Sequence, residues 1–446
     1  MIPYDSFTYF GLLLYPAAAA VLVGLVGLRG PWRTWAIVLI SAAVLSVQFA
    51  NPLGDAAARA SGLRQLRFLG WYTLESMILI GLLLLLRRRG SRPLPYWLAV
   101  ALALAPLVAV KFQPLLLAHL GPHAAPISPL LAAANRLHTP PRTGVTPGSS
   151  PGILNPTTGY LALPAGLFDT LGFLGISYMT FRVLDVIILI QDGIVREFRP
   201  GELLAYLTFF PTISAGPIDR YRRFAADLQA GPSSRGDYLR HVETGIHRTV
   251  QGLLYKFIIA TLIQRYWLIP ASVHPGAWGQ VDYMYAYSLY LFFDFAGYSA
   301  FAIGTGHLLG ITVPENFAGP FLARNFREIW NRWFITLSWW LRDHVYMRFV
   351  LGATRRKWFG GNRYAASYVG FLLTMGLMGL WHGPTAYYLV YGLYQGVMLI
   401  AYDFLARWNK RRRLVPSNLL TECLSVFVTF NLFCFSLLIF SGHLFQ

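Results

Sequence analysis

His382 is the residue of this sequence best suited to acid–base chemistry. It follows an apolar, glycine-rich stretch, and a Gly-Pro pair that should end a helix comes directly after it. A neutral imidazole accepts protons near neutral pH, and an ionisable side chain at membrane depth is costly enough to suggest function. The alternative is a histidine hydrogen-bonded between packed helices, because Gly376, Gly379 and Gly383 would let other backbones approach closely.

Four other ionisable residues lie within apolar stretches and are interpreted as structural polar anchors. Asp294 lies in the middle of 284–310, where an Arg, a Tyr hydroxyl or a backbone turn would offset its burial. His307 lies near the end of the same stretch. Arg182 and Asp185 are three residues apart, which places them on one helical face where they can pair.

The sequence contains none of the common metal or nucleotide motifs. It has no phosphate-binding loop, no GxGxxG or GxSxG pattern and no HExxH pattern. The spacing of Cys423 and Cys434 matches no metal or redox site. No metal site is therefore predicted, and a nucleotide-driven pump is not favoured.

The elements that must position these residues are membrane helices. Of the 446 residues 55% are hydrophobic and only 13% are charged, against roughly 25% charged residues in soluble domains. Long apolar stretches cross lipid as helices, because every backbone group must be satisfied internally. The mostly apolar stretches are 8–28, 35–50, 69–86, 95–110, 171–191, 284–310, 366–381, 384–403 and 419–440.

The formal net charge of +18 points to membrane loops and not to nucleic acid. Basic clusters follow the apolar stretches, as expected for cytoplasmic loops that contact anionic lipid headgroups. They are Arg29 with Arg33, Arg87 to Arg89 with Arg92, Arg196 with Arg199, and Lys410 to Arg413. Membrane lipids are therefore expected partners.

The chain is predicted to have four regions. They are N-terminal transmembrane helices over 1–120, an external loop rich in Pro and Gly over 121–168, a core over 169–403, and a basic loop with a C-terminal transmembrane helix over 404–446. Within the core, 208–217 is too short and broken to span and predicts a re-entrant segment. Residues 246–268 predict a tilted span. Residues 324–349 repeat apolar side chains at three- and four-residue steps among arginines, which predicts an interfacial amphipathic helix.

Five ordered stretches resemble the membrane-bound O-acyltransferase family, and most closely its D-alanyl transfer branch, the DltB proteins. They are 209–224, 290–304, 314–321, 326–348 and 378–396. The resemblance is strong over 170–400 and rests on pattern alone in the N-terminal helices. It implies an all-α polytopic ring of about 10–11 transmembrane helices with re-entrant and interfacial helices, and a tunnel between the two faces of the bacterial cell membrane.

The resemblance also implies roles for residues and partners. The histidine of the family's WHG motif, here His382, is the catalytic residue. The D-alanyl branch takes its acyl group as a thioester on the phosphopantetheine arm of an acyl carrier protein, so no cofactor stays bound. It works with an extracytoplasmic DltD-like partner and delivers to a hydroxyl of a cell-envelope polymer such as teichoic acid.

Further residues are assigned on the same basis. The candidates to line the substrate tunnel are Asn331, Arg332, Ser338 and Trp381. The candidates to dock the carrier protein are Arg220, Arg222 and Arg223, which follow a Gly-Pro turn and could meet an acidic surface.

The chain departs from the family pattern at Phe334, which stands where bacterial relatives carry a second histidine in RWHxxLS. A phenyl ring cannot transfer a proton. A catalytically impaired scaffold is therefore one alternative. The others are an exopolysaccharide O-acetyltransferase of the same family and an envelope-lipid transporter, which also suits broken helices and buried polar residues. The 121–168 loop is a second departure.

Overall fold

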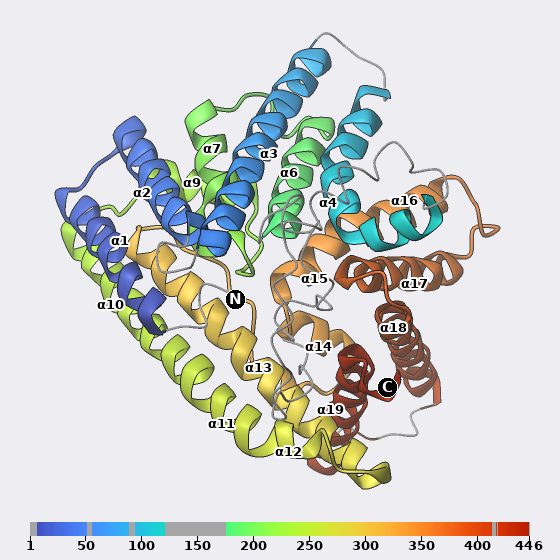
Figure 1. Cartoon of the computed structure of the whole chain (residues 1–446). Coiled ribbons are helices and arrows are strands. Elements are labelled where there is room, and N and C mark those ends of the chain that lie inside the picture. The colour runs from blue at the N-terminus through green and yellow to red at the C-terminus, as the bar shows by residue number, and fades with distance from the viewer. Residues whose placement is uncertain are drawn as a thin grey trace. The chain divides into compact units, whose positions relative to one another are not determined.

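The computed structural model describes residues 7–50, 56–88, 94–120, 175–412, 416 and 418–445. This part of the chain folds into helices joined by turns, with one isolated β-bridge between Phe317 and Trp333 (Figure 1). The predicted all-α class is thus confirmed for the described residues. The predicted 121–168 loop lies outside them.

The described residues form two compact units. The first comprises the described residues up to 249 together with 301–313, and the second comprises 250–300 and 314–445. The helices of the first unit are α1 (Phe7–Val26), α2 (Gly30–Ala50), α3 (Ala56–Arg88), α4 (Leu94–Leu120), α6 (Ile176–Gln191), α7 (Pro200–Thr208), α8 (Phe210–Ile213), α9 (Tyr221–Ala230) and most of α10 (Arg235–Leu253). Within this unit α2 packs on α3 and α7, and α6 packs on α3 and α4.

The second unit holds the elements around His382. In chain order they are η1 (Leu254–Ala260), α11 (Thr261–Ile263), η2 (Gln264–Leu268), α12 (Ile269–Ala271), most of α13 (Gly276–Leu308), η3 (Pro320–Leu322), α14 (Phe326–Arg332), α15 (Ile335–Leu341), η4 (Arg342–Tyr346), α16 (Met347–Arg355), α17 (Arg363–His382), α18 (Ala386–Arg412), α19 (Leu419–Ser441) and η5 (His443–Phe445). Helix α18 packs on both α17 and α19.

Six described helices are long and apolar enough to cross a membrane, so the chain is a multi-pass membrane protein. The spans are Gly30–Phe49, Arg59–Arg87, Pro95–Phe112, Arg363–His382, Ala386–Arg412 and Leu419–Ser441. Residues 404–412, which the sequence assigned to a loop, are instead the last part of α18. The last turn of this helix carries three basic residues, whose positive charge is stabilised by the negative end of the helix dipole.

The prediction of one amphipathic helix over 324–349 is wrong. The helix breaks at Trp333 and Phe334, which separate α14 from α15. The reason is competition for backbone hydrogen bonds by a neighbouring segment. The Ala318 N–H donates to the Arg332 carbonyl at 3.0 Å, and the Ile335 N–H donates to the Asn316 carbonyl at 3.0 Å. These bonds replace helical ones.

The short segment at 208–217 is confirmed as broken, and it is largely buried in protein. Helix α8 lasts four residues, all of them buried. Gly175, at φ +107°, admits the carbonyl of Ile213, because an added Cβ would overlap that oxygen. Arg182 is 2% exposed and donates to the carbonyls of Tyr206 at 2.9 Å and Leu207 at 3.0 Å. Arg182 therefore anchors the end of α7 to α6.

Candidate active site

His382 is the last residue of α17. The helix begins at Arg363 and is capped by Asn362, whose side chain accepts the N–H groups of Tyr364 at 3.0 Å and Ala365 at 3.2 Å. It ends because Gly383 is extended and the proline after it cannot continue the helix. The imidazole is thereby held at a fixed helix end, next to the turn that leads into α18.

Aromatic rings surround the imidazole of His382. The ring of Trp381 lies 4.6 Å away, that of Phe440 4.8 Å away and that of Tyr388 5.9 Å away, measured between centroids. Trp381, a predicted tunnel residue, is thus adjacent to the proposed catalytic group. His382 is half-buried and not fully enclosed.

Glycines allow α17 and α18 to approach closely beside the site. A Cβ built on Gly379 would overlap the Tyr388 carbonyl oxygen and would lie 3.2 Å from the Cα of Gly392. A Cβ on Gly383 would lie 2.8 Å from the Tyr388 ring. At Gly376 the nearest atom is 3.5 Å away, an ordinary contact. The predicted close approach of another backbone is therefore confirmed at Gly379, whereas Gly383 and Gly376 have side chains as their nearest neighbours.

Phe334 packs between two aromatic rings from other elements of the same unit. It is 6% exposed, its ring meets Phe295 edge-on at 4.8 Å, and it lies 6.5 Å from the ring of Trp381. Its backbone is left-handed, with φ 44° and ψ 51°. This conformation costs a residue with a Cβ about 1–2 kcal/mol, and such strain tends to occur at functional sites.

Asn316 fixes the strained backbone at Phe334, and sequence reasoning missed its role. It is 0% exposed, its carbonyl accepts the Ile335 N–H, and its side-chain oxygen accepts the Thr336 hydroxyl at 2.6 Å. Its amide donates to the Ser299 hydroxyl at 3.2 Å. A signal was present, because Asn316 lies in one of the five stretches that carry the family resemblance.

Thr385 is a second residue that sequence reasoning missed. Its hydroxyl is buried three residues after His382 and has no hydrogen-bond partner among the described residues. An unpaired buried hydroxyl is unfavourable. Because it lies beside the proposed catalytic residue, it is a candidate to hydrogen-bond a substrate.

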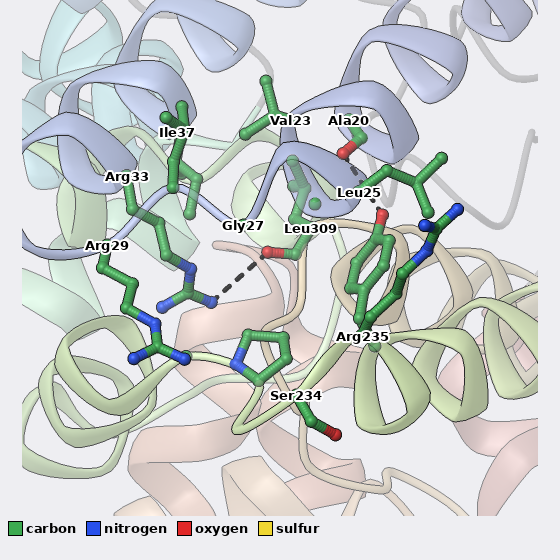
Figure 2. A pocket seen from close by; sticks show the side chains of 15 residues that line it. Ala20, Val23, Leu25, Gly27, Arg29, Arg33, Ile37, Ser234, Arg235 and Leu309 are labelled. Carbon is green, nitrogen blue, oxygen red and sulfur yellow. Dashed lines mark hydrogen bonds between the residues drawn. The ribbon is translucent and has the colours of Figure 1, made fainter.

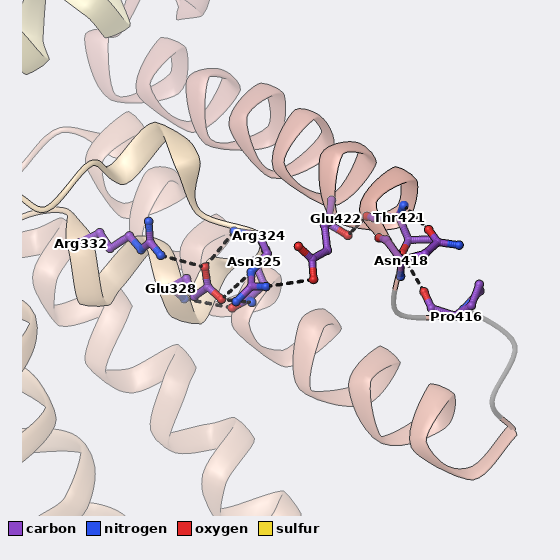
Figure 3. Close-up of polar contacts among 9 residues, drawn as sticks. Arg324, Asn325, Glu328, Arg332, Pro416, Asn418, Thr421 and Glu422 are labelled. Carbon is purple, nitrogen blue, oxygen red and sulfur yellow. Dashed lines mark hydrogen bonds and ion pairs between the residues drawn. The ribbon is translucent and has the colours of Figure 1, made fainter.

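The other three tunnel candidates, Asn331, Arg332 and Ser338, differ in their surroundings. Asn331 is exposed on α14, and the Ser338 hydroxyl lies 3.4 Å from the carbonyl of Trp333. Arg332 lies 3.6 Å from Glu328, which also pairs with Arg324 at 3.3 Å. Figure 3 shows how this series of charges continues from Arg324 to Glu422 on α19, at 3.4 Å. Arg332 therefore takes part in an ion-pair network that ties α14 to α19.

The predicted anchors Asp294 and His307 have partners that the sequence did not suggest. Asp294 pairs with Lys256, whose side chain is 6% exposed and which was not among the partners expected from sequence. Gly297 lets the backbone of Lys256 approach closely, since a Cβ there would lie 2.8 Å from the backbone nitrogen of Lys256. His307 Nδ1 lies 3.0 Å from His241 Nδ1.

Two of the three predicted docking arginines pair with carboxylates inside the protein. Arg220 binds Asp185 at 2.9 Å, and Arg223 Nε binds Asp219 at 2.7 Å. Arg222 is exposed. Asp185 thus links α6 to the start of α9, as expected of an anchor, and among the three arginines Arg222 is the one free to meet a partner.

His443 is a second imidazole near the end of α19, outside the membrane spans. Its ring stacks on Tyr283 at 3.9 Å, and burial lowers its pKa below the usual value. The neutral form of His443 is therefore favoured, and the ring packs as an aromatic group.

Comparisons with known proteins identify the family of the chain. The profile of the membrane-bound O-acyltransferase family matches residues 194–443, which include His382. The teichoic acid D-alanyltransferase of Bacillus subtilis (strain 168) is 37% identical over 100% of this chain and 99% of its own length. That of Streptococcus thermophilus is 42% identical over 63% of this chain and 70% of its own. The probable alginate O-acetylase AlgI of Pseudomonas syringae pv. tomato is 34% identical over 51% of this chain and 42% of its own.

The apolar spans indicate a membrane protein, and the similarity over the whole length indicates the same kind of protein. The chain belongs to the membrane-bound O-acyltransferase family and is a multi-pass acyltransferase of the bacterial cell membrane.

Proposed function

We propose that this chain transfers D-alanyl groups to a hydroxyl of teichoic acid, with His382 as the general base. The observation that supports this most is that similarity to a teichoic acid D-alanyltransferase extends over the entire chain. Similarity to the alginate O-acetylases covers about half of it. The greater extent of the similarity therefore favours D-alanyl transfer over acetyl transfer.

The orientation of α18 supports an acceptor that arrives from outside the cell. This helix ends in Lys410, Arg411 and Arg412, and basic ends of spans lie in the cytoplasm. The opposite end of α18, next to His382, then lies toward the external side. A hydroxyl of an envelope polymer reaches His382 from that side, while the acyl donor comes from the cytoplasm.

The reaction is a direct transfer between a thioester and an alcohol. His382 accepts the proton of the acceptor hydroxyl as its oxygen attacks the thioester carbonyl carbon. The carbon–sulfur bond breaks, and His382 returns the proton to the departing thiolate. The products are an ester and a free thiol. General base catalysis contributes about 10²–10⁴-fold, and the aromatic surroundings supply exclusion of water.

The donor and the protein partners are part of the same proposal. The thioester is carried on the phosphopantetheine arm of an acidic carrier protein, and an extracytoplasmic DltD-like protein assists on the other side. Arg222, exposed on α9, supports a contact with an acidic surface. The substrate is thus delivered to the protein and is not a resident cofactor.

The test uses the full chain in proteoliposomes with its carrier protein. Radiolabelled D-alanyl carrier is added outside, on the face that corresponds to the cytoplasm, and lipoteichoic acid is enclosed inside. We expect labelled polymer, and none with acetyl-CoA as donor. Labelling from the acetyl donor alone would indicate an O-acetyltransferase, and movement of polymer without any donor would indicate a transporter.

A further inference from the structure

A pocket of about 100 Å³ in the first unit carries three arginines and no carboxylate on its wall. It lies between the link from α1 to α2 and the link from α9 to α10. Figure 2 shows Arg29 and Arg33 on one side of it and Arg235 on the other. The residues of this wall belong to none of the elements around His382.

Arg33 is buried in the pocket wall and keeps its charge. It is 4% exposed, and its guanidinium donates to the carbonyls of Asp227 at 2.9 Å, Leu228, and Gly310 at 2.8 Å. Carbonyl dipoles solvate the cation but do not neutralise it. The Asp227 carboxylate offsets part of this charge through space, and the remaining positive potential attracts an anion.

Arg29 and Arg235 are exposed at the rim of the pocket and have donors to spare. Arg29 donates to the carbonyl of Ser233 at 3.2 Å. Arg235 makes no hydrogen bond or ion pair with any residue that the structure describes. Guanidinium groups bind phosphate oxygens in pairs of parallel hydrogen bonds, and most of the donors at this rim are available for that.

The nearest carboxylates bind other groups as well and offset only part of the positive charge of the pocket. Asp227 accepts the Thr312 N–H at 2.9 Å and lies 3.6 Å from Arg223. Asp237 accepts the Ser233 N–H at 2.8 Å, which holds the pKa of its carboxyl below the usual value. The pocket therefore keeps an excess of positive charge at pH 7.

The lip of the pocket is apolar and belongs to the apolar helix α1 and the membrane span α2. Leu25 lines the pocket, and Leu22 and Val26, on the same helix α1, are 62% and 73% exposed. Trp32, at the start of α2, is 77% exposed. Tryptophan at a helix end marks the headgroup level of a bilayer. A ligand here would thus meet basic groups at one end and apolar surface at the other.

We propose that this pocket binds the phosphate of an anionic phospholipid headgroup, with the acyl chains along the exposed face of α1. Arg29 and Arg235 bind the phosphate oxygens, and Arg33 supplies fixed positive potential behind them. The bound lipid would tie the α1–α2 link to the start of α10. This role is independent of acyl transfer.

The test is native mass spectrometry of the full chain, purified in a non-ionic detergent with equal amounts of phosphatidylglycerol and phosphatidylcholine. We expect one phosphatidylglycerol to be retained in preference to phosphatidylcholine. The variant Arg29→Gln/Arg235→Gln should weaken that retention about tenfold or more, because it removes charge-assisted hydrogen bonds. The matched control Arg411→Gln/Arg412→Gln removes the same charge from exposed positions of α18 and should retain the lipid.

Three results would overturn the proposal. They are equal retention by the Arg29→Gln/Arg235→Gln variant, no preference over phosphatidylcholine, and full displacement by millimolar inorganic phosphate, which would indicate a pocket for free anions. The unfolding temperature in phosphatidylcholine alone shows whether the double variant folds. If it does not, Arg235→Gln alone serves, because this exposed side chain makes no contact that folding requires.

Discussion

The ring of Phe334 lies 6.5 Å from the ring of Trp381, and Trp381 lies 4.6 Å from the imidazole of His382. A residue that cannot transfer protons thus supports the proposed catalytic base through one intervening ring. Asn316 holds the left-handed backbone that aims Phe334 in this direction. We therefore assign proton transfer to His382 alone and a packing role to Phe334.

The packing role of Phe334 predicts how its variants behave. Phe334→His should keep transfer near the wild-type rate, and it should not restore activity to His382→Ala. Phe334→Gly should relieve about 1–2 kcal/mol of backbone strain but lose more, about 3–5 kcal/mol, with the buried ring. Transfer rates and unfolding temperatures in detergent measure both effects. Rescue of His382→Ala by the new histidine would show that Phe334 occupies a catalytic position.

The contact between α17 and α18 predicts different effects of two neighbouring glycines. Gly379→Ala should separate the helices and cost about 1–3 kcal/mol by overpacking, because its Cβ would overlap the Tyr388 carbonyl. Gly376→Ala should be tolerated, since its nearest neighbour is 3.5 Å away. Thermal unfolding and transfer assays compare the two. Equal effects would contradict the described packing.

The buried pair of Lys256 and Asp294 predicts a large effect of breaking it. Lys256→Met removes the lysine that pairs with the buried Asp294 carboxylate and should cost about 3–5 kcal/mol. The double variant Lys256→Met/Asp294→Leu should recover most of that stability. Unfolding temperatures of the single and double variants form the comparison. If the double variant were less stable than Lys256→Met, the Lys256–Asp294 pair would not be a purely structural anchor.

The unpaired hydroxyl of Thr385 predicts a loss of transfer without a loss of folding. Thr385→Val keeps the shape of the side chain and removes the buried hydroxyl, so stability should not fall. The transfer rate should fall about tenfold if the hydroxyl binds the reacting carbonyl. Thr385→Ser should keep activity. An active Thr385→Val protein would exclude a role for this hydroxyl.

Sequence reasoning found the catalytic candidate because its signals are local. A histidine after an apolar run, followed by a helix-breaking pair, is visible without any long-range contact, and α17 does end at His382. The helical class follows equally directly from the apolar stretches, which become α2, α3, α4 and α17 to α19.

What could not be predicted depends on contacts between distant segments. The break at Phe334 is caused by hydrogen bonds from the segment around Asn316, which no periodicity reveals. Asp294 pairs with a lysine 38 positions earlier in the chain, so local spacing could not identify it. Local spacing could not identify the partners of Arg33 either, because Asp227 and Gly310 lie 194 and 277 positions away in the chain.

Replacement of His382 tests the central claim most directly. D-alanyl transfer from the loaded carrier to enclosed lipoteichoic acid is measured in proteoliposomes for wild type, His382→Ala and His274→Ala, an exposed control. The account predicts a fall of about 10²-fold or more for His382→Ala, with an unchanged unfolding temperature and full activity in the control. Transfer by His382→Ala at the wild-type rate would contradict it.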